Sequence, residues 1–174
     1  PNGTDTVRVL SEGFEMDVVD LARLEPVPEE TGHSASLIRG VCAAFAKKGW
    51  PLRGFDAYTT SAVLKGSGLS SSAAFEVLIG NIANHLFAGG AESPVTIAQI
   101  GQYAENVFFD KPSGLLDQMA SSVGGVVAMD FADPAAPLVR PLTLDQAGQG
   151  YALCIVDTGA DHADLTDEYA AIPA

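Results

Sequence analysis

The chain has 174 residues, of which 47% are hydrophobic and 18% charged, a balance typical of a folded globular protein and unlike that of a disordered chain. Twenty-two acidic residues against nine basic ones give a formal net charge of −13, which repels nucleic acids and anionic membrane surfaces. No apolar run is long enough to cross a bilayer and no basic-then-apolar leader opens the chain, so we expect a cytoplasmic protein without a nucleic-acid or membrane partner.

The first fifty residues predict a hairpin, a loop and a helix. Residues 6–11 and 14–20 alternate around a Glu-Gly pair, which predicts a β-hairpin. Residues 21–32, with two prolines and paired glutamates, are expected to form a solvated loop. Ser34 or Ser36 is then expected to cap a helix, which runs to Lys48 and stops at a glycine. Its apolar stripe consists of Leu37, Val41, Ala44 and Phe45.

Strands and helices alternate in the remainder. Further helices are expected over residues 70–87, from Ser93-Pro94 to before Lys111, and over residues 115–121. Further strands are expected over residues 54–64, 126–131, 138–142 and 151–157. This order predicts an α+β fold with a mixed or antiparallel sheet. The two cysteines, Cys42 and Cys154, lie in apolar stretches and are expected to be buried thiols rather than a disulfide or a metal site.

A glycine-serine segment between a predicted strand and a predicted helix is the first candidate for chemistry. Residues 64–74 read LKGSGLSSSAA. Two glycines allow close backbone approach to a ligand, and the three serines fall in the first helical turn, where free N–H groups favour an anion. Taken alone, such segments are more often structural caps. The pattern G-x-x-x-x-G-K-[ST] is absent, which excludes an ordinary P-loop.

A pair of carboxylates is the second candidate. Glu105 lies mid-helix in QYAENVFFDKPSGLLDQ, and Asp117 follows twelve residues later, beyond a break at Lys111-Pro112. The break lets the two carboxylates converge from two directions, an arrangement that suits phosphoryl transfer. Taken alone, Glu105 is more often an exposed helical residue, and Asp117 is more often a cap or an exposed acid.

Both segments resemble signature motifs of the GHMP small-molecule kinases, and G-x-G-L-S-S-S-A-A with G-L-L-D-Q is similar to the galactokinase branch. Leu64 and Lys65 depart from the usual proline and small residue. The resemblance implies that the loop binds the phosphates of ATP through Gly66, Ser67, Gly68, Leu69, Ser70, Ser71 and Ser72. It further implies that Ser72 and Glu105 bind Mg²⁺, that Asp117 takes the proton from the anomeric hydroxyl of the sugar, and that Gly114 contacts the sugar.

A weaker match covers residues 157–169, DTGADHADLTDEY. His162 and Tyr169 coincide with a family segment whose tyrosine hydrogen-bonds the sugar, which makes Tyr169 a candidate substrate contact. Asp161 stands where the family has an arginine. His162 can equally pair with Asp164 or Asp167 on a solvated surface.

The resemblance implies a GHMP kinase N-terminal domain, of the ribosomal protein S5 domain 2-like fold, over residues 1–174. The domain is expected to be incomplete at its start, with residues 158–174 beginning the link to a C-terminal domain. The first and third signature motifs are absent from the chain. We therefore expect the full-length protein to phosphorylate galactose at its anomeric hydroxyl with ATP and Mg²⁺, and the 174-residue chain alone to be inactive. The alternatives are a kinase for another sugar or small alcohol, or a non-catalytic sensor of sugar and nucleotide.

Overall fold

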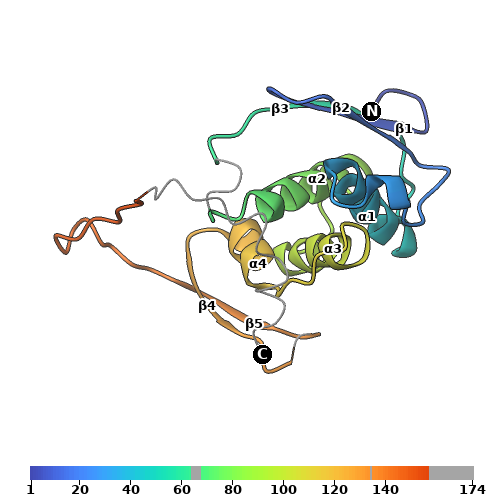
Figure 1. Cartoon of the computed structure of the whole chain (residues 1–174). Helices are drawn as coiled ribbons and strands as arrows, with labels where there is room; N and C mark the ends of the chain where they lie inside the picture. Colours follow the sequence, from blue (N-terminus) through green and yellow to red (C-terminus); the bar gives the residue numbers. More distant parts are fainter. Residues whose placement is uncertain (64–67, 134, 157–174) are drawn as a thin grey trace.

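The computed structural model describes residues 1–63, 68–133 and 135–156. Within these ranges four α-helices lie between a three-stranded sheet and a β-hairpin (Figure 1). The elements are β1 (Thr6–Ser11), β2 (Met16–Asp20), a 3₁₀ turn (Pro28–Glu30), α1 (Ser34–Lys47), β3 (Asp56–Thr59), α2 (Ser71–Phe87), α3 (Pro94–Val107), α4 (Leu116–Val123), β4 (Val126–Asp130) and β5 (Leu138–Leu142). The predicted α+β class is confirmed.

The three-stranded sheet is mixed, with β1 in the centre. β1 pairs antiparallel with β2, as the predicted hairpin requires, and parallel with β3. Val7, Val9 and Val19 alternate with exposed residues and point to the helical side, where they are fully buried. The sheet therefore has one apolar face that α1 covers.

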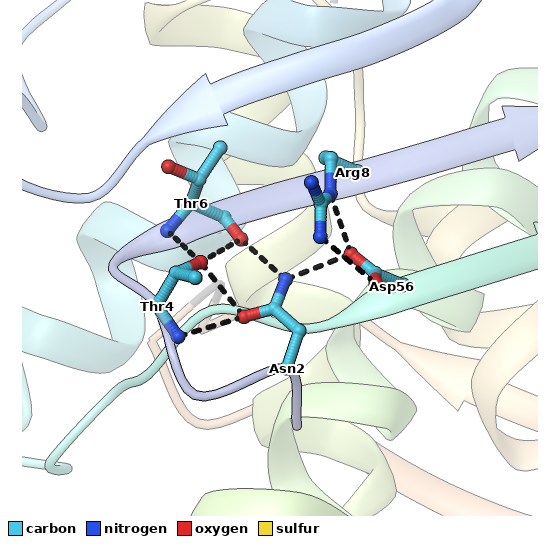
Figure 2. A network of polar contacts seen from close by, with 5 residues as sticks. All are labelled: Asn2, Thr4, Thr6, Arg8 and Asp56. Atoms are coloured by element: carbon cyan, nitrogen blue, oxygen red, sulfur yellow. Dashed lines mark hydrogen bonds and ion pairs between the residues drawn. The ribbon is translucent and has the colours of Figure 1, made fainter.

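Polar side chains connect β3 to β1 through hydrogen bonds and an ion pair on the outer face of the sheet (Figure 2). The Arg8 guanidinium forms a two-pronged ion pair with Asp56, at 2.7 and 3.0 Å. The Asn2 amide donates at 2.7 Å to Asp56 Oδ1, the oxygen that also accepts Arg8 Nε, and at 3.0 Å to the carbonyl of Thr6. These contacts fix the parallel register, in which Arg8 lies opposite Asp56.

The helices pack closely because small residues face each other. Ten consecutive residues of α1, Ser36 to Phe45, are buried, since this helix lies against both the sheet and the other helices. At Gly40 a Cβ would lie 2.7 Å from the Cα and Cβ of Ala104. Ala104 is fully buried in α3, so the two backbones touch at this point. The contact fixes the height and rotation of α3, which positions Glu105.

Helix starts follow the sequence at α3 but not at α1. The side chain of Ser93 accepts the N–H of Thr96 and caps α3, as predicted. α1 begins after His33, and neither predicted serine caps it. Ser34 Oγ donates to Asp17 at 2.7 Å, and Ser36 Oγ donates back to the carbonyl of His33 at 2.8 Å. A tertiary contact therefore engages the Ser34 hydroxyl, and a local backbone contact engages that of Ser36, so neither is available as a cap.

Three expectations about strands and thiols are corrected. β3 covers only Asp56–Thr59 of the predicted 54–64. Residues 151–156 form no strand, and in Figure 1 the segment after β5 runs away from the helices. Cys154 is exposed for the same reason, because its apolar neighbours have no partner within the described residues. Cys42 is buried, and burial raises the pKa of its thiol to about 12. None of the helices described here is long and apolar enough to span a bilayer.

The α1–α3 contact yields a stability prediction. Gly40→Ala should lower the free energy of unfolding by about 1 to 3 kcal/mol, because the new methyl group overlaps backbone atoms of α3. This loss should outweigh the gain of ~1 kcal/mol in helix propensity that alanine brings. Urea denaturation measures the change.

Gly80→Ala in α2 is the matched control, since its Cβ would meet only side-chain atoms of Ile97. Its destabilisation should be clearly smaller. Equal effects at the two positions would contradict a backbone contact at Gly40.

Candidate active site

The start of α2 has a strained backbone. Ser70, the residue before the helix, adopts φ 60° and ψ 45°, a left-handed conformation that is uncommon outside glycine. Its side chain makes no capping hydrogen bond. Gly68 also has a positive φ, of 72°. Such strain concentrates where a backbone is shaped for a ligand, and here it presents the first turn of α2, with Ser71 and Ser72, to a cavity.

The cavity beside this turn has a volume of about 660 Å³. Ser71 and Ser72 line it from α2, Glu12 and Asp17 from the β1–β2 hairpin, and Ser61 from the segment after β3. Its size suits a nucleotide, which needs several hundred Å³.

Glu105 is buried beside Ser72 and is 2% exposed. Its Oε1 accepts the hydroxyl of Ser72 at 2.9 Å and the ammonium of Lys111 at 2.8 Å. Burial raises the pKa of Glu105, but hydrogen bonds from Lys111, Ser113 and Ser72 and the charge of Lys111 outweigh burial, so the net pKa is lowered. Glu105 is therefore an ionised carboxylate facing the serine turn, and not the exposed residue that its position alone would favour.

The second oxygen of Glu105 contacts a residue that the sequence analysis did not select. Gln118 Nε2 donates to Glu105 Oε2 at 2.7 Å and to Glu76 Oε2 at 3.0 Å. Gln118 and Glu76 are both fully buried. Burial first, and then the charge of Glu105, raise the pKa of Glu76 to about 8, so Glu76 is mostly neutral at pH 7. α2, α3 and α4 thus meet at one polar cluster.

Asp117 is exposed in the first turn of α4, directly before Gln118. Its charge contributes to the raised pKa of Glu76, which places it within electrostatic range of the cluster. Gly114 is exposed in the loop before α4. That loop is fixed to α3, since the Ser113 carbonyl accepts the amides of Gln102, at 3.0 Å, and Asn106, at 3.3 Å.

The predicted site residues are therefore only partly assembled here. The structure brings Ser72 and Glu105 into contact and places Asp117 in the first turn of α4, directly before the Gln118 that bonds Glu105. Leu69 is exposed near the turn. Gly66, Ser67 and Tyr169 lie outside the described residues.

Sequence reasoning missed Glu76, Lys111 and Gln118. One signal was present for Glu76, which lies four residues after Ser72 and so shares its helical face. Neither Lys111 nor Gln118 has a comparable spacing to mark it, because each reaches Glu105 only through the fold.

The donor set fits a magnesium ion that also binds phosphate. Mg²⁺ takes oxygen ligands at right angles about 2.1 Å away, so neighbouring ligands lie about 3 Å apart. Ser72 Oγ and Glu105 Oε1 are 2.9 Å apart. Among the described residues no group of three or more His, Cys, Asp and Glu side chains forms a self-sufficient metal cage. Phosphate oxygens and waters would have to supply the remaining ligands, as in kinases generally.

The chain matches a known protein family over the region that holds this geometry. Residues 36–125 match the family described as GHMP kinases N terminal domain, and this range includes both candidate segments. The chain belongs to this family. The resemblance drawn from the serine loop and the carboxylate segment is thereby confirmed.

Several relatives are galactokinases. The chain is 33% identical to the galactokinase of Streptomyces coelicolor over 94% of this chain and 42% of the relative. It is 31% identical to that of Chloroflexus aurantiacus over 97% of this chain and 42% of the relative. Among solved structures, Lactococcus lactis galactokinase complexed with galactose aligns with a TM-score of 0.68 and 26% identity, covering 82% of this chain and 38% of that one. The chain thus spans about two fifths of the length of the galactokinases it matches.

The buried acid Glu76 makes stability depend on pH. A carboxyl whose pKa is about 8 in the folded state and about 4.5 in the unfolded state contributes stability that is complete below pH 4.5 and is lost as pH rises through 8. Glu76→Gln removes this titration while keeping shape. The variant should therefore gain stability relative to wild type between pH 4.5 and 8, by several kcal/mol at the upper end, with no further gain above it.

Denaturation midpoints of both proteins across this pH range measure the difference. Asn84→Ala, which removes a buried amide from the same helix, is a suitable control and should give a difference that does not grow with pH over this range, because neither side chain titrates. A pH-independent difference for Glu76→Gln would contradict a raised pKa.

Proposed function

We propose that the full-length protein is a galactokinase, which transfers the γ-phosphoryl group of ATP to the anomeric hydroxyl of galactose with Mg²⁺. The carrying observation is the ionised, buried Glu105 in contact with Ser72 at the strained start of α2. The galactose acceptor rests on the relatives, several of which are galactokinases, one with galactose bound. We further propose that the enzyme is cytoplasmic and that the chain is part of its N-terminal domain.

The start of α2 supplies the phosphate site. The first-turn N–H groups of α2 and the hydroxyls of Ser70, Ser71 and Ser72 present donors and a positive dipole end to the phosphates. This local field is needed because the chain carries a net charge of −13, which repels ATP at long range. Ser72 and Glu105 would hold Mg²⁺. When bound, the ion neutralises charge on the β- and γ-phosphates.

Asp117 is the proposed base. Its carboxylate lies in the first turn of α4. It is close enough to the cluster for its charge to contribute to the raised pKa of Glu76. It would accept the proton of the anomeric hydroxyl as that oxygen forms its bond to the γ-phosphorus and the bond from phosphorus to the departing ADP breaks. The loop at Gly114, fixed by Gln102 and Asn106, would lie against the sugar.

A base at position 117 distinguishes an enzyme from a sensor, which needs no proton acceptor. Other motifs of the family are absent from the chain, so we propose that the 174-residue chain is inactive by itself. The full-length protein is the right material for kinetics.

Replacement of the proposed base tests the function. In the full-length protein Asp117→Asn should lower kcat about 10²- to 10⁴-fold, the range for loss of a general base, and leave the affinity for ATP nearly unchanged. Galactose-dependent release of ADP measures the rate. Glucose and other sugars, assayed in parallel, test the acceptor.

Asp110→Asn is the matched control, since it removes the same charge from the preceding loop. Asp110 has φ 64°, a conformation that asparagine also adopts readily. The control should retain activity. A fully active Asp117→Asn variant would contradict the proposal, and phosphorylation of another sugar in preference to galactose would contradict its choice of acceptor.

A further inference from the structure

Three polar side chains from three helices meet without water access behind the candidate metal site. Glu76 on α2 and Gln118 on α4 have no exposed surface, and Glu105 on α3 is 2% exposed. Gln118 Nε2 lies between the two carboxyl groups and contacts both. The role proposed above for Glu105 uses only its other oxygen, Oε1.

We propose that Gln118, anchored by Glu76, is a positioning residue that fixes the orientation of the Glu105 carboxylate toward the divalent cation. The inference rests on the proposed function only in taking Glu105 as a cation ligand. It assigns to Glu76 and Gln118 a role in cation affinity that does not require them to touch the cation.

The hydrogen bonds of Gln118 define the orientation. A primary amide has two N–H donors, and here one points to each carboxyl group. With Oε2 of Glu105 held at 2.7 Å by Gln118, Oε1 is directed to Ser72 and Lys111. If Gln118 lost its donors, Oε2 would lose a 2.7 Å hydrogen bond in a buried site, and the carboxylate would rotate to recover one. Outer groups of this kind commonly set the geometry of a metal ligand.

Glu76 in turn holds Gln118. Its Oε2 accepts the second N–H of the amide, which leaves the amide a single favourable rotation. A neutral acid suits this role, because a second full negative charge next to Glu105 would be strongly unfavourable in a buried site. Glutamine at position 76 would offer the same acceptor without any charge.

Packing around the cluster excludes alternative arrangements. A Cβ at Gly101 would lie 3.2 Å from Gln118 Cγ, Glu76 Cβ and Glu76 Oε2, so this position in α3 leaves room only for the two side chains. Two oxygens of the cluster, Glu76 Oε1 and Gln118 Oε1, have no hydrogen-bond partner within the described part of the chain. A core built only for stability would favour apolar side chains here, since buried polar atoms without partners cost free energy.

The hydrogen bond from Gln118 to Glu105 also links the proposed base, Asp117, to the proposed cation ligand. Asp117 directly precedes Gln118 in the first turn of α4, so a hydrogen bond from Gln118 to Glu105 also limits movement of that turn relative to α3. Loss of the contact should therefore affect cation affinity first and the rate of transfer second.

Binding of Mn²⁺ tests the inference without relying on turnover. In the full-length protein with a non-hydrolysable ATP analogue, free Mn²⁺ is titrated by electron paramagnetic resonance. Gln118→Met and Glu76→Met, which keep bulk and remove the polar contacts, should each raise the Mn²⁺ dissociation constant about 10-fold or more, as loss of an outer-shell partner does. Glu76→Gln, which keeps an acceptor for the Gln118 amide, should bind Mn²⁺ with nearly wild-type affinity. The double variant Gln118→Met with Glu76→Met should bind no more weakly than either single variant, since both break one chain of contacts.

Asn84→Ala is the control for loss of a buried amide elsewhere in α2. Asn84 is 8% exposed, and its side chain bonds the backbone of Glu92, at 3.0 and 3.1 Å. It should lower the melting temperature and leave Mn²⁺ affinity unchanged. The inference is overturned if Gln118→Met binds Mn²⁺ as wild type does, or if Glu76→Gln loses as much affinity as Glu76→Met. Should Gln118→Met fail to fold, the two Glu76 variants decide.

The outcome is separable from that of the proposed function. A wild-type protein that binds Mn²⁺ with this pattern of variant effects, yet phosphorylates no sugar, would support the positioning role and contradict the kinase. A protein that phosphorylates galactose, but whose Gln118→Met variant keeps the Mn²⁺ affinity of the wild type, would support the kinase and contradict the positioning role. Absence of Mn²⁺ binding by the wild type would contradict both.

Discussion

A buried carboxylate must have hydrogen-bond donors around it, and in this protein the donors of Glu105 come from three separate segments. Ser72 donates from the start of α2, Lys111 from the loop after α3, and Gln118 from α4. An ionised group removed from water without such partners would cost many kcal/mol. The carboxylate therefore determines how the surrounding segments can be placed: each must deliver a donor to the same point.

Packing in the remainder of the fold holds the Glu105 carboxylate in position. Contact between Gly40 and Ala104 brings α1 against α3 one residue before Glu105. The mixed sheet, held in register by the polar contacts of Arg8 and Asp56, covers the other side of α1. Gly101 makes room for Glu76 and Gln118 on the inner face of α3. The proposed cation ligand Glu105 is thus set on a closely packed helix, while the serines proposed to bind the phosphates lie at the start of α2.

Local signals predicted much of this arrangement from sequence. The hairpin, the α3 cap at Ser93 and the four helices follow from alternation, capping chemistry and periodicity, which act over a few residues. The family resemblance implied a shared role for Ser72 and Glu105, and the structure places these two side chains in contact. Its physical form, a buried carboxylate with donors from Ser72, Lys111 and Gln118, depends on contacts between residues as far as thirty-three positions apart.

Hydrophobic periodicity alone predicts the wrong environment for Val107, near the end of α3. The apolar spacing of α3 would place Val107 inside with Ile97 and Ile100, but it is 46% exposed, while Glu105 is buried. Hydrophobicity alone favours valine in the core, and the donors that make burial of Glu105 favourable come from other segments. For the same reason Gln118 could not be selected from sequence, and Glu76 was marked only by its spacing of four residues from Ser72. The exposed strand-like residues 151–156 illustrate the opposite case, a local pattern whose partner is not among the described residues.

The central claim is that Ser72 and Glu105 together hold the divalent cation of a sugar kinase. A crystal structure of the full-length protein with Mn²⁺ and a non-hydrolysable ATP analogue, with anomalous scattering recorded at the manganese edge, tests it most directly. The account predicts one manganese peak bonded to Ser72 Oγ and Glu105 Oε1 and to phosphate oxygens, with Gln118 still bonded to Glu105 Oε2. A manganese peak elsewhere, with Glu105 Oε1 still bonded to Lys111 and Ser72 as in the present structure, would contradict it.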